Sequence, residues 1–180
     1  MTEVDAIKTL IATPEPPELG PGPREKVESE SQLGSKLEAF FEAERMPVQK
    51  QQLLRALALL WHDHLQSAHV IAQDIHTPDG SFVHAIMHRR EPDYENSKYW
   101  FHRVGRHPAF PAIATAVGAL LQSRQLGELR QILTADGEWD PFAFVDSCRE
   151  AAGARGSRGN VLREIQRIEI ECLMNSIRSR

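Results

Sequence analysis

The hydrophobic positions of this 180-residue chain recur with a helical period, and no stretch of useful length alternates as a β-strand does. The clearest case covers residues 48–75, where successive side chains are 100° apart around the helix axis. One face of this predicted helix is apolar apart from a single histidine: Leu57, Leu60, Trp61, His64, Ala68, Ile71 and Ile75. We therefore expect an all-α protein.

Start and stop signals divide the chain into a single-domain bundle of about six to seven helices. A capping box at Ser35–Glu38 predicts the start of the first helix, and Pro47 predicts the start of the long helix over 48–75. The turn at Thr77–Gly80 ends that helix, and Pro92 ends the next one. The remaining helices are expected over 81–90, 93–105, 111–125, 141–151 and 160–177, with a short satellite of the 111–125 helix over 127–133 and a loop over 153–159.

Residues 1–34 differ in composition from the rest of the chain. They hold five of the eleven prolines, and seven acidic residues against three basic ones. Such a segment can bury little apolar area. We expect an extended or disordered N-terminal arm over 1–34, with a short helix near 5–11, and a helical domain over 35–180. Residues 19–24 could lie over the body in polyproline conformation. Residues 1–33 are expected to be dispensable for folding.

The overall composition narrows the classes of protein. A hydrophobic fraction of 41% and a charged fraction of 26% are ordinary for a globular domain. The net charge of −4 argues against a nucleic-acid-binding protein, and no apolar run is long enough to span a membrane. Cys148 and Cys172 form no C-x-x-C pair and are expected to be reduced thiols. The acidic, proline-rich N-terminus fits no signal peptide, so we expect a cytoplasmic protein. The sequence carries no signal for an oligomeric state.

All eight histidines lie between positions 62 and 107, and residues 56–88 contain no Lys, Arg or Glu. A solvent-facing helix normally carries those charges, so this region is expected to be shielded or to line a cavity. The second face of the helix over 48–75 alternates imidazole and carboxamide groups: His62, Gln66, His69, Gln73 and His76. This face predicts either the wall of a pocket or a polar seam between helices.

Three of these histidines are candidate metal ligands. His84 and His88 are four residues apart, which places both on one helix face. The turn at Thr77–Gly80 should fold their helix back and bring His88 level with His69. Three neutral imidazoles suit zinc, iron, nickel or copper and leave a position open for water or a small polar substrate. Asp63 or Glu91 would then be the catalytic base or would orient a ligand.

A second interpretation is a non-catalytic module that binds a small polar or anionic molecule. Residues 88–106 are rich in Arg, Tyr and Trp, and guanidinium groups bind carboxylates and phosphates well. The candidate ligand-binding residues are His62, Gln66, Gln73, Arg90, Tyr94, Lys98 and Tyr99. A third interpretation is a structural or interaction protein without metal, in which the histidines hydrogen-bond within the bundle and most of the arginines pair with nearby carboxylates.

The same region carries a family resemblance. Its central motifs are W-H-D-H at Trp61–His64 and H-R-R-E-P-D-Y at His88–Tyr94. The resemblance is supported further by Gln73–Ile75, Asp79–Ser81, His84, Asn96, Lys98–Trp100 and Arg103–Gly105, and more weakly by Trp139, Phe144–Asp146, Ile165 and Gln166. With these motifs the chain resembles an uncharacterised family of bacterial and fungal helical proteins without an assigned activity. The resemblance implies a grouping and no mechanism.

Overall fold

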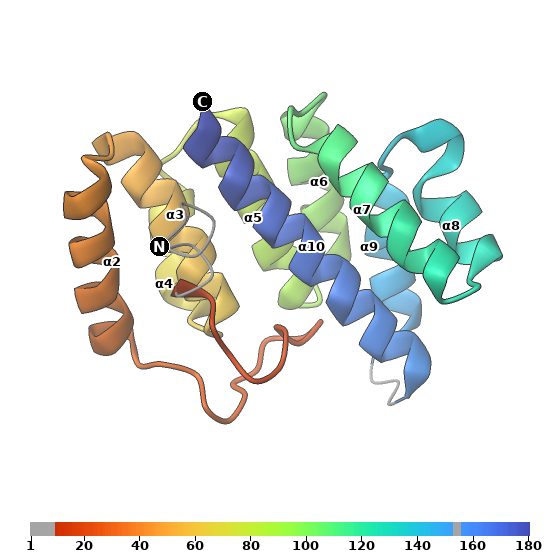
Figure 1. Ribbon diagram of the computed structural model, residues 1–180, viewed down its shortest axis with the longest axis horizontal. Coiled ribbons are helices and arrows are strands. Elements are labelled where there is room, and N and C mark those ends of the chain that lie inside the picture. Colours follow the sequence, from red (N-terminus) through yellow and green to blue (C-terminus); the bar gives the residue numbers. More distant parts are fainter. Residues whose placement is uncertain (1–9, 153–155) are drawn as a thin grey trace.

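The computed structural model describes residues 10–152 and 156–180, and this part of the chain is helical without a β-strand (Figure 1). The all-α prediction is confirmed, but a count of six to seven helices is too low, since nine α-helices lie in the described ranges. They are α2 (Glu30–Glu44), α3 (Val48–Trp61), α4 (Leu65–Ala72), α5 (Pro78–Arg90), α6 (Tyr94–Val104), α7 (Phe110–Ser123), α8 (Gly127–Leu133), α9 (Pro141–Glu150) and α10 (Ser157–Ser179), with a 3-10 turn at Ala135–Gly137. In these described residues no helix is long and apolar enough to cross a membrane.

The single helix predicted over 48–75 is two helices. It breaks after Trp61, where Asp63 adopts the left-handed conformation with φ of 66°. Aspartate tolerates this conformation better than most residues. The break resets the helical phase, so His62 becomes fully buried and His64 does not join the core face.

Helix α5 is the buried centre of the molecule. Every residue from Gly80 to Arg90 is buried, and α5 packs against α3, α4 and α6. In Figure 1, α10 crosses this central helix with the α2–α4 group on one side and α6–α9 on the other. The predicted shielding of the region without Lys, Arg and Glu is confirmed for α5, whereas α4 exposes Gln66 and Val70 to solvent.

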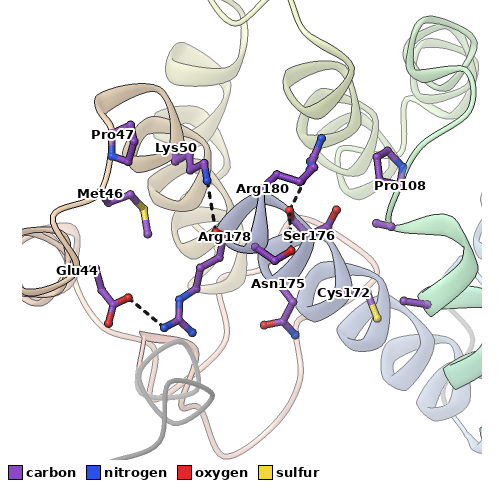
Figure 2. A pocket seen from close by; sticks show the side chains of 13 residues that line it. Glu44, Met46, Pro47, Lys50, Pro108, Cys172, Asn175, Ser176, Arg178 and Arg180 are labelled. Atoms are coloured by element: carbon purple, nitrogen blue, oxygen red, sulfur yellow. Dashed lines mark hydrogen bonds and ion pairs between the residues drawn. The ribbon is translucent and has the colours of Figure 1, made fainter.

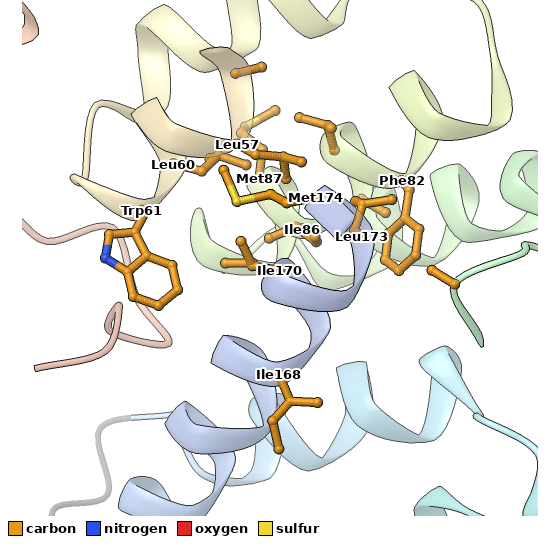
Figure 3. Close-up of a cluster of buried hydrophobic side chains, with 14 of the residues drawn as sticks. Leu57, Leu60, Trp61, Phe82, Ile86, Met87, Ile168, Ile170, Leu173 and Met174 are labelled. Atoms are coloured by element: carbon orange, nitrogen blue, oxygen red, sulfur yellow. The ribbon is translucent and has the colours of Figure 1, made fainter. Parts of the chain in front are cut away.

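The apolar core lies where α10 passes over α3 and α5. Ile170, Leu173 and Met174 of α10 are fully buried and face Leu57 and Ile86 (Figure 3). The α5 side chains that face the other way, toward α4 and α6, include the histidines. The central helix thus contributes one face to the core and another to a polar cluster.

The first helix of the body begins earlier than the capping box at Ser35–Glu38 predicts. Helix α2 begins at Glu30, and its capping box is formed by Ser29 and Gln32 rather than by Ser35–Glu38. The short helix predicted near 5–11 falls mostly outside the described residues.

The arm itself, residues 10–28 in the structure, lies against the body of the protein. Leu10 and Ile11 are buried, and Gln166 of α10 donates hydrogen bonds to the carbonyls of Pro17 and Glu18. Composition predicts an extended or disordered arm, and in the structure polar side chains of the body bind the backbone of this arm.

Candidate metal centre

The structure brings together the three histidines that the sequence selected. One ring nitrogen from each of His69, His84 and His88 lies within 4.8 Å of the others. The rings of His84 and His88 are stacked, with centroids 5.1 Å apart, and His69 meets both edge-on at 4.8 and 5.5 Å. Ligand atoms of a tetrahedral zinc ion are about 3.4 Å apart, so the imidazole rings would have to move for all three nitrogens to bind one ion.

Local sequence explains this meeting. Thr77 caps α5 by accepting a hydrogen bond from the Gly80 amide, and Pro78 occupies the first turn. A Cβ atom on Gly80 would lie only 2.1 Å from the carbonyl oxygen of Ile75, so only glycine permits this close return of the chain. The tight connection holds α4 against α5 and places His69 beside the His84–His88 pair.

Helix α6 closes another side of the cluster. The Ser97 hydroxyl donates a 2.7 Å hydrogen bond to the Ala85 carbonyl and fixes α6 against α5. The Trp100 ring lies parallel to the His84 ring, with centroids 4.0 Å apart. His84 is therefore stacked between His88 and an indole.

His84 is the most unusual member of the cluster. Its side chain is buried, and its Nδ1 atom has no hydrogen-bond partner among the described residues. Burial, followed by the neighbouring His88 and His69, lowers the pKa of His84 to about 4. The imidazole is thus neutral at neutral pH, and its buried Nδ1 atom is without a partner in the described part of the chain. Both properties suit a metal ligand.

His88 has polar neighbours of its own. Its Nδ1 atom is 3.4 Å from a Glu91 carboxylate oxygen. The Asn96 amide nitrogen is 3.1 Å from His88 Nε2 and 3.4 Å from Nδ1. Burial lowers the pKa of His88, while Glu91 opposes this shift.

Asp63, the other candidate base, has a different environment. Arg90 contacts its Oδ1 atom at 2.6 Å, Arg24 contacts its Oδ2 atom at 2.9 Å, and its side chain has no exposed surface. These arginines keep the pKa of Asp63 below its usual value against the opposing effect of burial. A carboxylate held on both oxygens cannot accept a proton readily, so Asp63 is a structural residue.

The same arrangement removes Arg90 and His62 from the predicted ligand-binding set. Arg90 is fully buried and also donates to the Leu60 and Gly20 carbonyls. His62 accepts a hydrogen bond from the Glu28 amide at Nδ1 and contacts the Leu10 carbonyl through Nε2. Both side chains hold the N-terminal arm instead of facing a ligand.

The other predicted ligand-binding residues do not converge on one site. Gln66, Gln73 and Tyr99 are exposed, Lys98 pairs with Asp146 at 2.6 Å, and Tyr94 lies under the Arg149 guanidinium. His76, which completes the predicted polar face, is also exposed. Of that face, only His69 belongs to the cluster, because the break at Asp63 separates His62 from the rest.

Two residues of the site were missed by sequence reasoning as site residues, although both lie in the motif-rich segment. Trp100 stacks on His84, and Asn96 approaches His88. Their spacing of four residues on α6 is the one signal that could have placed them on a common face.

A cavity of about 770 Å³ lies away from this cluster, between the α2–α3 corner, the start of α7 and the end of α10 (Figure 2). None of the predicted site residues lines it. Two pairs of its polar groups contact each other: Arg178 pairs with Glu44, and Lys50 donates to the Arg178 carbonyl. The cavity therefore adds no catalytic group to the histidine cluster.

Comparison with protein-family models, with curated proteins and with solved structures finds no match to this chain. The resemblance based on the W-H-D-H and H-R-R-E-P-D-Y motifs stays a prediction. In the structure, both motifs contribute to docking of the arm. Trp61 donates to the Thr13 hydroxyl, His64 contacts the Glu28 carbonyl, and Asp63 and Arg90 bind as described above.

Proposed function

We propose that the protein binds one divalent transition metal ion through His69, His84 and His88, and that an open position on the ion accepts a small polar molecule. The observation that carries the proposal is the buried His84 Nδ1 atom, which lacks a partner among the described residues and lies in a cluster of three imidazoles. An unsatisfied buried polar atom destabilises a fold, and a metal ion would compensate for it.

The chemistry of the donors supports zinc, nickel, cobalt, iron or copper rather than magnesium or calcium, which prefer oxygen. Three protein nitrogens are the donor set of many catalytic zinc sites, where the remaining position carries water. Glu91 is the carboxylate available to orient His88 or to accept a proton from that water. A metal-dependent reaction on a small polar substrate is therefore the enzymatic form of the proposal.

The test is metal binding by the full chain after removal of metal with a chelator. Titration with zinc, cobalt or nickel is followed by calorimetry and should show one metal-binding site per chain. Binding should also stabilise the fold by about 2.7 kcal/mol at a free metal concentration 100 times the Kd. Because Trp100 stacks on His84, a paramagnetic ion such as Ni²⁺ or Cu²⁺ should quench indole fluorescence.

Matched histidine variants separate the site from non-specific binding. His69→Gln combined with His88→Gln should abolish the one-to-one binding. His76→Gln and His102→Gln change exposed histidines and should leave it unchanged. If the chain binds no metal, or if the exposed variants weaken binding as much as the cluster variants do, the proposal is wrong.

A further inference from the structure

A cavity of about 720 Å³ lies where the docked arm meets the body of the protein. Residues 18–21 of the arm form one wall, and the start of α6, the end of α9 and the start of α10 form the others. None of His69, His84 and His88 lines it, so this cavity is separate from the proposed metal centre. Small organic ligands bind in cavities of about 300–1,000 Å³, and this one is of that size.

Most of the lining is apolar. The apolar side chains belong to Leu19, Pro21, Pro92, Ala151 and Ala152. Cys148 also lines the cavity and is buried. Burial raises the pKa of its thiol to about 12, so the thiol stays protonated and is a poor nucleophile. These properties suit the binding of an apolar carbon body rather than covalent catalysis.

The polar groups that line the cavity are mainly hydrogen-bond donors. The Tyr94 hydroxyl forms no hydrogen bond with the residues that the structure describes. Asn160 accepts a 2.5 Å hydrogen bond from Arg163 through Oδ1, which leaves its N–H groups without a partner in the same part of the chain. A ligand that satisfies these donors must therefore supply acceptor oxygens.

Arg163 is paired with a carboxylate that belongs to the arm. Its Nη1 atom lies 2.5 Å from Glu18 Oε1, and the Glu18 side chain is 41% exposed. An ion pair this exposed contributes little to stability. The Glu18 backbone is held separately, because its carbonyl accepts a hydrogen bond from Gln166. A free carboxylate can therefore replace that of Glu18 on Arg163 while the arm stays docked.

We propose that this cavity binds a small carboxylic acid with an apolar carbon body. The carboxylate of the ligand takes the place of the Glu18 carboxylate and accepts hydrogen bonds from Arg163 and Asn160. The carbon body lies against the apolar wall, and the Tyr94 hydroxyl donates to a ligand oxygen from the α6 side. Tyr94 is the one member of the predicted ligand-binding set that lines this cavity. The site does not depend on the metal centre of the proposed function.

The experiment uses the full chain with a chelator present, so that no metal ion contributes. Hexanoate and benzoate are the probes, and hexanamide and benzamide are their neutral counterparts. Titrations followed by ¹H–¹⁵N NMR should shift the amides of Leu19, Ala152 and Arg163. Each acid should bind about tenfold or more tightly than its amide, since hydrogen bonds to charged groups are the stronger ones. Inorganic phosphate, which has no apolar body, should bind more weakly than either acid.

Matched variants test the donors. Arg163→Gln removes the charge and should weaken hexanoate binding about tenfold or more, and Tyr94→Phe should weaken it about fivefold. Arg167→Gln is the control, because Arg167 pairs with Glu171 one turn further along α10 and does not line the cavity. It should leave the affinity unchanged.

Glu18→Gln gives a change of opposite sign. It removes the carboxylate that competes for Arg163, so hexanoate should bind about two- to fivefold more tightly, as the strength of an exposed ion pair implies. If the Glu18–Arg163 pair only held the cavity wall in place, the same variant would weaken binding instead.

Three results would overturn the inference. The first is that neither acid shifts the amides of the lining residues. The second is that Arg167→Gln weakens binding as much as Arg163→Gln does, which would indicate general attraction of anions to α10. The third is weaker binding by Glu18→Gln. Because the measurements are made without metal, none of these results bears on the histidine cluster.

Discussion

Arg24 of the N-terminal arm reaches Asp63, at the break between α3 and α4, with 2.9 Å between Nε and Oδ2. Asp63 also binds Arg90 of the central helix, so one buried carboxylate joins three distant parts of the chain. The described part of the arm therefore lies against the helical body, whereas its composition predicts an extended or disordered segment.

Replacement of Asp63 tests this structural role. Asp63→Ala leaves two buried arginines without their carboxylate, and we expect a loss of about 3–5 kcal/mol in the free energy of unfolding. Urea denaturation measures it, with Asp74→Ala as the control because Asp74 is exposed. A stable Asp63→Ala protein that had lost only an activity would instead return Asp63 to the catalytic role expected from sequence.

Gly22 provides a second test of the docked arm. Its φ of 81° is unfavourable for other residues, and an added Cβ would lie 2.8 Å from the Asp63 carboxylate. Gly22→Ala should therefore destabilise the protein by about 2 kcal/mol or more. Gly20→Ala is the matched control, since a Cβ at Gly20 meets nothing within 4 Å. Equal stability of the two variants in thermal denaturation would show that the arm does not bind as described.

Acid should weaken the attachment of the arm through His62. Burial is the main cause that lowers the pKa of His62 below its usual 6.5; Arg24 and His64 add to it, while the Leu10 hydrogen bond and Glu28 oppose it. Because the folded pKa is below the unfolded one, the unfolded state binds more protons. The stability is complete above pH 6.5 and falls as the pH drops through the folded pKa.

His62→Gln separates this effect from other titrations. Glutamine can accept from the Glu28 amide and donate to the Leu10 carbonyl, but it does not titrate. With chelator present to exclude metal, the variant should lose less stability than the wild type between pH 7 and pH 5. Parallel pH profiles for the two proteins would contradict the prediction.

A buried ion pair between Arg89 and Glu169 gives a further prediction. Arg89 also donates to Gln166 and lies over the Phe144 ring, 4.4 Å from its centroid. Glu169→Ala should cost about 3–5 kcal/mol, because it leaves a buried guanidinium unpaired. The double change Arg89→Met with Glu169→Leu should recover much of this loss in urea denaturation. No recovery would indicate that the Gln166 and Phe144 contacts of Arg89 carry most of its contribution.

Much of the fold and the core of the site could be predicted from local sequence. Asp93, and Asp140 with Pro141, predicted the starts of α6 and α9, because caps act on backbone groups within one turn. His84 and His88 share a face through helical spacing alone, and the turn at Thr77–Gly80 returns the chain to His69. The cluster His69, His84 and His88 depended only on these short-range rules.

Tertiary structure decided the rest. The break at Asp63 depends on Arg24 and Arg90, which lie 39 and 27 residues away in the chain. Helical periodicity carries no information about such distant partners. The prediction based on it therefore joined α3 and α4 into one helix and placed His62 on a polar face. The docking of the arm, the stacking of Trp100 on His84 and the approach of Asn96 to His88 likewise arise from packing between helices. Sequence determined which imidazoles share a face, whereas only the folded chain determined which polar side chains bind the arm and which surround the histidine cluster.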